Sequence, residues 1–159
     1  MIKIIKDSNG DTRTAKGEIS FEEFQISNDR HKKDVLNVMK MLAEDIIEAG
    51  EQHDHTKKEF EELFFKEFSD SRKNGTDFRE SSWFKQHIEE ERHHLNDHVP
   101  DGVDLVDVIE MIADCVCAGL ARSGSVREVV IPDEVLREAV KNTAEYIQSQ
   151  CVVVEAGEN

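Results

Sequence analysis

The residues of this sequence that could do chemistry are histidines and acidic residues placed far apart along the chain. The sequence has 7 histidines and 35 aspartates and glutamates. Imidazole nitrogens and carboxylate oxygens together bind divalent ions such as Fe, Mn and Zn. The most telling candidates are a histidine, a His-Asp pair and a later aspartate: His31, His53, Asp54 and Asp114. Their residue types predict a site for a divalent metal ion.

Asp114 is the acid whose surroundings point most directly to a metal. It lies within Met111–Ala118, where almost every neighbour is apolar. A carboxylate buried without a partner costs several kcal/mol or takes up a proton, so a metal ion or a set of histidines is the expected partner. One alternative stays open. Asp107, Glu110 and Asp114 are spaced 3 and 4 apart, so they could form a solvated strip of one helix.

Other histidines fall on faces of predicted helices. His31 stands four residues before Val35, on an apolar stripe that is expected to face the core. His87 and His94 are seven residues apart, which places them on one helical face, two turns apart. His93 is expected to point elsewhere, because its spacing from His87 turns it to another side of the helix. The alternatives for each are a hydrogen-bonded core histidine and a polar helix face.

The elements that would position these side chains are mainly helices. Helical periodicity predicts five helices, over about 27–50, 51–70, 82–98, 104–121 and 132–150. Ile2–Ile5 and Cys151–Val154 are typical of strands and could pair into a small sheet, and Asn9-Gly10 signals a hairpin. The predicted fold class is mostly α, a single-domain helical bundle of about five helices with short β segments at the termini.

Length and composition indicate the number of domains and the classes of partner to expect. One domain over residues 1–159 is expected, with a helical core at 28–122 and peripheral segments at 1–20 and 151–159 that form a small β element or are disordered. A net charge of −15, with 35 acids against 20 bases, argues against general nucleic-acid binding. No run approaches about 18 apolar residues and nothing resembles a signal peptide, so no membrane contact and a cytoplasmic location are expected.

The order of these residues resembles a known family. His31, then His53-Asp54, then Asp114 is similar to the H…HD…D pattern of the HD-domain superfamily of metal-dependent phosphohydrolases. The resemblance is greater to small phage and bacterial HD-like proteins, and it covers about residues 28–122. Its further shared segments are His53–Lys57, Trp83–His87, His93-His94 and Glu110–Asp114.

The resemblance implies an all-helical HD-type fold and hydrolysis of a nucleotide or related small phosphoester by a metal-activated water. His31, His53, Asp54 and Asp114 would hold one or two divalent ions, Mn, Fe, Zn or Mg. His87 and His94 are candidates for a second ion, with Asp54 as the bridge. The expected location becomes the host cytoplasm if a phage encodes the chain.

Three cations are candidates for contact with the phosphorylated substrate. Lys57 follows His53 by one helical turn, so it could steady a phosphate and, with Asp54, is an expected catalytic residue. An equally open alternative makes Lys57 a surface residue on the rim of that face. Arg92 and Arg122 are weaker candidates for the same role.

Two other functions stay open, and so does a homo-oligomeric state. The first is an all-α nucleotide pyrophosphohydrolase, in which Glu89–Glu91, Glu110 and Asp114 would bind Mg²⁺ around a triphosphate. This leaves His31 and His53 unexplained. The second is a non-catalytic metal-binding protein with a regulatory or interaction role. Metal content and turnover of a nucleotide panel would separate the three.

Overall fold

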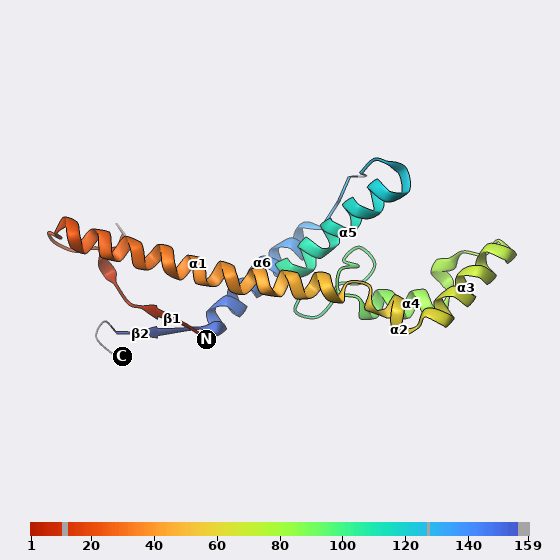
Figure 1. Ribbon diagram of the computed structural model, residues 1–159, viewed down its shortest axis with the longest axis horizontal. Coiled ribbons are helices and arrows are strands. Elements are labelled where there is room, and N and C mark those ends of the chain that lie inside the picture. The colour runs from red at the N-terminus through yellow and green to blue at the C-terminus, as the bar shows by residue number, and fades with distance from the viewer. Residues whose placement is uncertain (11–12, 127, 156–159) are drawn as a thin grey trace. The chain divides into compact units, whose positions relative to one another are not determined.

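A computed structural model describes residues 1–10, 13–126 and 128–155 of the chain (Figure 1). The elements in chain order are β1 (Ile2–Ile5), the 3₁₀ helix η1 (Ser8–Gly10), α1 (Phe21–Gln52), α2 (His55–Glu59), α3 (Glu61–Asn74), the 3₁₀ helix η2 (Phe78–Glu80), α4 (Ser82–Glu90), α5 (Leu105–Ser123), α6 (Asp133–Gln150) and β2 (Cys151–Val154). The predicted class, mostly helical with short terminal strands, is confirmed. An HD-type arrangement of the helices stays a prediction.

The chain divides into two compact units, one of Met1–Glu44 with Ala144–Asn159 and one of Asp45–Thr143. In the first unit β1 and β2 pair in parallel, with Ile2 opposite Cys151. The predicted pairing of the terminal strands is therefore confirmed. The hairpin predicted at Asn9-Gly10 is wrong, because β1 takes β2 as its partner and Asn9 lies in η1. That the two units form one domain stays a prediction.

The start of α1 differs from the prediction because an earlier cap is used. Ser20 Oγ accepts the backbone N–H of Glu23 at 3.2 Å, and the Glu23 carboxylate accepts the backbone N–H of Ser20 at 2.8 Å. This reciprocal pair is a capping box, so the helix begins at Phe21. Ser27, where the predicted helix begins, donates its hydroxyl proton to Asp7 at 2.6 Å, and Arg30 pairs with the same carboxylate.

The apolar core of the second unit lies where α5 and α6 pack against the segment before α5. Its buried residues are Leu95, Val103, Val108, Met111, Val135 and Ala139. Asp104 caps α5 in a reciprocal box with Asp107, and Thr143 of α6 accepts the backbone N–H of Leu105 at 2.9 Å. The capping box of α5 and the apolar periodicity of both helices explain why the last two predicted helices match α5 and α6 closely.

The middle of the second unit departs from prediction at its helix ends. α4 was expected to reach His98 but ends at Glu90, and the chain from there to the start of α5 is irregular. The first residue of this segment, Glu91, is buried and accepts both the backbone N–H and the hydroxyl proton of Thr56. The Glu91 backbone N–H still bonds to the His87 carbonyl at 2.9 Å, so this is the last helical bond of α4, and the Glu91 side chain contacts a residue 35 positions earlier. Nearby, Trp83 stacks on Phe64, with ring centroids 4.1 Å apart.

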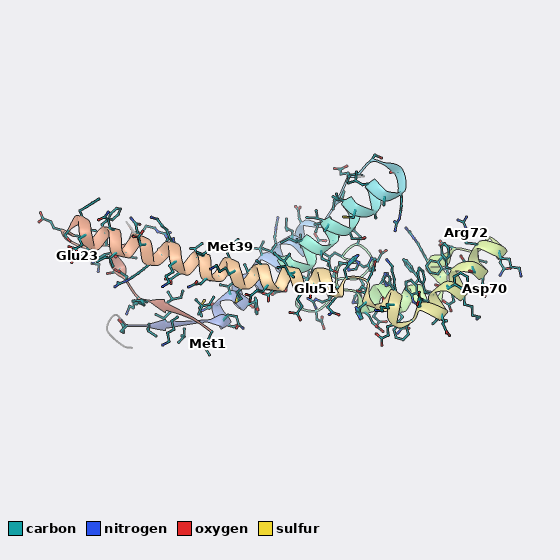
Figure 2. All side chains as sticks on the ribbon, viewed as in Figure 1. Met1, Glu23, Met39, Glu51, Asp70 and Arg72 are labelled. Carbon is teal, nitrogen blue, oxygen red and sulfur yellow. The ribbon has the colours of Figure 1, made fainter. Side chains whose placement is uncertain are left out.

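The surface of the second unit is strongly charged. Asp70 and Arg72 on α3, for example, are not buried (Figure 2). Within the described residues, no helix combines the length and the apolar character needed to cross a membrane. Some polar side chains of this unit are nevertheless buried, and several of these lie around the turn between α1 and α2.

Candidate metal centre

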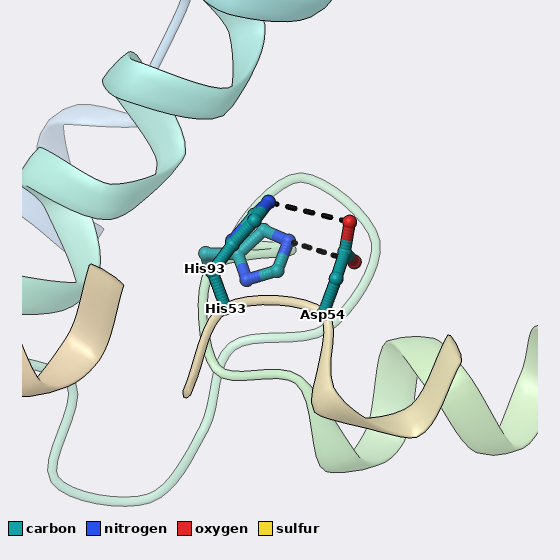
Figure 3. Close-up of side chains that lie close together, drawn as sticks. All are labelled: His53, Asp54 and His93. Atoms are coloured by element: carbon teal, nitrogen blue, oxygen red, sulfur yellow. Dashed lines mark ion pairs between the residues drawn. The ribbon is translucent and has the colours of Figure 1, made fainter. Parts of the chain in front are cut away.

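The centre is organised around Asp54, in the turn between α1 and α2. Its backbone is left-handed, with φ of 57°, a conformation that aspartate tolerates better than most residues. The turn lifts the carboxylate toward three imidazoles. Oδ2 lies 3.3 Å from His53 Nε2, and Oδ1 lies 3.4 Å from His87 Nε2 and 3.9 Å from His93 Nε2. Figure 3 shows Asp54 facing His53 and His93 across the turn.

These residues form two groups that share Asp54. The first group is His53, Asp54 and His93, and the second is Asp54, His87 and His94; the ligand atoms of each lie within 4.8 Å of one another. Two atoms each about 2.0–2.2 Å from one ion can be at most about 4.4 Å apart. The Asp54 distances meet this limit, as does the 2.9 Å between His87 Nε2 and His94 Nε2. These largely buried groups could hold a metal ion.

Three buried atoms at the centre have no hydrogen-bond partner among the described residues: Asp54 Oδ1 and the two ring nitrogens of His93. Nδ1 of His93 has Glu110 beside it as an ion-pair partner, whereas Asp54 Oδ1 and His93 Nε2 face each other. A buried polar atom without a partner costs about 1–3 kcal/mol. Since the two atoms lie 3.9 Å apart, a cation between them would satisfy both together. The donor chemistry therefore fits a metal ion.

Glu110 stands behind the first group. Its Oε1 lies 2.9 Å from His53 Nδ1, in a hydrogen bond, and 3.0 Å from His93 Nδ1. A carboxylate on this side holds the proton at Nδ1 and leaves the Nε2 lone pair for a metal. Burial works to lower the pKa of His93, but Glu110 outweighs it and raises that pKa above its ordinary value. Glu110 thus orients both rings toward Asp54.

Thr56 and Glu91 stand behind the second group. The Thr56 hydroxyl donates to Glu91 Oε1 at 2.6 Å and also lies 2.6 Å from His87 Nδ1. Because a hydroxyl has one proton, His87 Nδ1 must be the donor in the second contact, and its Nε2 keeps a lone pair. His87 is 3% exposed, and burial, helped by His94, lowers its pKa to about 4. It is therefore neutral, the form that binds metals.

The histidines in and after α4 were predicted partly correctly. His87 and His94 do come together, with 2.9 Å between their Nε2 atoms, but not on one helical face as predicted, because His94 lies beyond the end of α4. The prediction that His93 points away is wrong, because α4 ends at Glu90 and the helical angle does not apply to residues beyond that end. His98 and His55 belong to neither group, and His55 Nδ1 instead lies 3.2 Å from Glu91.

Asp114 and His31 are both less buried than predicted. Asp114 Oδ1 is 3.7 Å from His53 Nε2, but its side chain is 33% exposed, not buried as predicted, and it is in neither group. His31 is exposed in the first unit, so the prediction that it faces the core is wrong. It lies within a helix that begins at Phe21 rather than in a first turn. Met39, on the same predicted stripe, is 58% exposed (Figure 2).

The three candidate cations have different surroundings. Lys57 pairs with Asp54 Oδ2. Burial works to raise the pKa of Asp54, but Lys57, with His53 and His87, holds it below its ordinary value. Arg92 binds both oxygens of Asp107 at 2.7 Å, which anchors the segment carrying His93 and His94. Arg122 is exposed in the last turn of α5. Lys57 is thus the candidate cation that lies at the centre.

Glu110 and Glu91 are the residues whose role sequence reasoning missed. Glu110 precedes Asp114 by one helical turn, which was the available signal that both face the same way. Glu91 comes after His87 at the same spacing, but its contact with Thr56 joins residues 35 apart in sequence. No local sequence pattern indicates a contact between residues so far apart in the chain. Glu110 contacts His53 and His93 directly, and Glu91 contacts His87 through Thr56, so these carboxylates hold the histidine rings in position.

A cavity of about 370 Å³ adjoins the centre within the second unit. Its walls come from the end of α1 and from α5, and its lining is Ile46, Ala49, Gly50, His53, Val106, Ile109, Glu110, Ala113, Asp114 and Cys117. The polar residues of the first group and its surroundings, His53, Glu110 and Asp114, therefore form part of its wall.

The chain belongs to the DUF5662 family, a family of unknown function, which matches residues 21–151. This range includes both groups and the carboxylates behind them. No curated protein and no solved structure matches the chain. Membership of the family therefore assigns no activity to this chain.

Proposed function

We propose that this member of the DUF5662 family is a metal-dependent phosphohydrolase that cleaves a small phosphoester with a metal-activated water. One observation carries the proposal: a single carboxylate, Asp54, is shared by two groups of histidines whose donor atoms lie at metal-binding separations. Paired ions about 3.5–4 Å apart are a recurrent arrangement in phosphatases. The His53-Asp54 pair at the heart of the centre also supports the likeness to HD-domain phosphohydrolases.

The residues have distinct roles in this proposal. Asp54 bridges the two groups, while Glu110 binds Nδ1 of His53 and Thr56 binds Nδ1 of His87, which leaves the Nε2 atom of each ring free for an ion. A bound ion would lower the pKa of its water to about 7 in the most favourable zinc case. Lys57, beside Asp54, brings a positive charge to the phosphate. The water oxygen bonds to phosphorus, the ester P–O bond breaks, and the proton lost by the water ends on the leaving alcohol.

The donor set favours some ions over others. Each group offers two imidazole nitrogens and one carboxylate, which suits Mn, Fe or Zn, whereas Mg²⁺ takes oxygen ligands. This also weighs against the pyrophosphohydrolase alternative. Glu89 and Glu90 are not buried at the centre, and Glu91 is engaged with Thr56, so the three do not form the acidic cluster that it needs.

The test is metal analysis of the purified full-length chain, followed by hydrolysis assays with Mn²⁺, Fe²⁺ and Zn²⁺ on p-nitrophenyl phosphate and a nucleotide panel. We expect bound metal and turnover in the wild type, and loss of both in Asp54→Asn. Asp70→Asn, the same change on α3 away from the centre, is the matched control. Metal without turnover of any substrate would establish the non-catalytic alternative, and a wild type that binds no metal would refute the proposal.

Asp114→Asn tests how closely the centre matches the HD pattern, which requires Asp114 as a ligand. A thermal melt with and without Mn²⁺ or Zn²⁺ measures this, because an ion that binds the folded state raises the melting temperature by mass action. We expect a smaller loss of that rise than in Asp54→Asn, since Asp114 lies outside both groups. Complete loss in Asp114→Asn would favour the HD arrangement of ligands instead.

A further inference from the structure

The cavity beside the first group has two chemically different parts. One end is formed by His53, Glu110 and Asp114, and the rest is mostly aliphatic, with Ile46 and Ile109 as its largest side chains. Its volume of about 370 Å³ lies at the lower end of the range for small-molecule sites, about 300–1,000 Å³. An apolar wall that ends at a group of histidines and carboxylates suits a molecule with an apolar body and a charged head.

Gly50 contributes to the opening of this cavity. It lies in the last turn of α1, which ends at Gln52. A Cβ built at Gly50 meets no described atom within 4 Å, so packing of the described chain does not require glycine there. The residue nevertheless lines the cavity. Its absent side chain keeps this part of the wall open to a ligand.

We propose that the cavity binds the apolar, alkyl or aryl, part of the substrate while the phosphate lies at the Asp54 centre. This inference rests on the proposed function and narrows it: the substrate is an alkyl or aryl phosphoester and not a nucleotide. The hydrolysis products are inorganic phosphate and an alcohol or phenol, when the substrate is a monoester.

The lining explains why a nucleobase is a poor occupant. A nucleobase carries several hydrogen-bond donors and acceptors, and each one buried without a partner costs about 1–3 kcal/mol. Val106, Ile109 and Ala113 on α5 offer it none from their side chains. An alkyl chain has no such groups to satisfy, and each methylene that leaves water contributes about 0.8 kcal/mol.

Two measurements on the full-length protein test this. The first is kcat/KM for straight-chain alkyl phosphates from methyl to octyl and for a nucleoside monophosphate. We expect a rise of about fourfold per methylene, which corresponds to about 0.8 kcal/mol each, until the cavity is full, and slower hydrolysis of the nucleotide. The second is calorimetric binding of the matching alkylphosphonates, which are not hydrolysed and should show the same trend.

Variants that fill the cavity should abolish the trend. Ala49→Phe fills it from α1, and Cys117→Phe fills it from an exposed position on α5, where folding tolerates change. Ala121→Phe makes the same kind of change at an exposed site on α5 outside the lining and should behave as wild type.

The outcomes separate the two proposals. Binding of alkylphosphonates that grows with chain length, without hydrolysis of any ester, would support the cavity and refute the activity. Hydrolysis with equal rates for methyl and octyl phosphate, or with preference for the nucleotide, would support the activity and overturn the cavity proposal. Retention of the trend in both filling variants would also overturn it, and neither binding nor turnover would refute both.

Discussion

The two groups that share Asp54 differ in what stands behind their histidines. In the first group the Glu110 carboxylate contacts Nδ1 of both His53 and His93 directly. In the second group the neutral Thr56 hydroxyl contacts His87, and the Glu91 charge lies one step further away. The pKa of His93 is accordingly raised by Glu110 against the opposing effect of burial, whereas burial takes the pKa of His87 down to about 4.

This difference indicates unequal affinities for metal ions. A carboxylate hydrogen-bonded to a ligating imidazole raises its basicity as a ligand, and it adds negative charge near the ion. The first group should therefore bind its ion more tightly, and the second should exchange its ion more easily. The site of the first group would then keep its ion, and the site of the second group would fill and empty as the concentration of free metal changes.

The largest expected effect is that of Asp54→Asn, because it acts on both groups. Loss of the shared carboxylate should lower metal affinity at both sites by more than about 100-fold, beyond the range for changes behind a ligand. Asparagine tolerates the left-handed backbone, so the helical circular dichroism should stay unchanged. Titration with Zn²⁺ by calorimetry measures this, and an unchanged second binding phase would show that Asp54 serves one group alone.

Glu110→Gln should weaken the first group selectively. The substitution keeps the shape but removes the charge behind His53 and His93, which should reduce affinity about 10–100-fold at that site. The second site should keep its affinity. The control is Glu134→Gln at an exposed position of α6. Equal weakening of both phases in the titration would contradict a division into two differently supported groups.

Thr56→Val should weaken the second group and also cost stability. It leaves His87 Nδ1 and Glu91 without their shared hydroxyl, and a buried unpaired group costs about 1–3 kcal/mol of unfolding free energy. We expect about a 10-fold loss of affinity at this site. Thr56→Ser restores the hydroxyl and should recover most of both. Urea unfolding and metal titration give the two readouts, and failure of serine to rescue would point to a packing role.

The smallest effect should come from Arg92→Lys, which acts on both groups equally. Lysine cannot bind both oxygens of Asp107, so the segment that carries His93 and His94 is held less firmly. Since the Arg92 side chain is 47% exposed, we expect at most about 1 kcal/mol of lost stability. Affinities at the two sites should fall together and slightly. A selective effect on one site would mean that Arg92 positions a single histidine.

Local patterns predicted some of this molecule well. The apolar periodicity of α5 and α6 is local to each helix, and Asp104 caps α5 from the position just before it, so the predicted ranges lie close to the observed ones. The His53-Asp54 pair was predicted from two adjacent residues and lies in the first group. His87 and His94 approach each other, but without the shared helical face that was predicted for them.

Other features depend on contacts between distant residues. At the end of α4 the Glu91 side chain contacts Thr56, which precedes it by 35 residues, and His93 lies beyond that end, where the helical angle does not apply. The role of Glu110 likewise depends on His53, 57 residues away. His31 was assigned from an ordered motif, but the order of residues along a chain does not fix whether a side chain is buried, and His31 is exposed. Long-range polar contacts are therefore the part of the centre that sequence periodicity could not supply.

The parallel pairing of β1 with β2 has a consequence for the order of folding. Ile2 pairs with Cys151, whereas the residues of the second unit form one continuous stretch, 45–143. Closing a long loop costs conformational entropy before its contacts repay it. The second unit can therefore fold while the two strands are still apart, and folding of the second unit shortens the loop that remains. In a pulsed hydrogen-exchange experiment, amides of α5 should gain protection before those of β1, and the terminal sheet should be the last part to close.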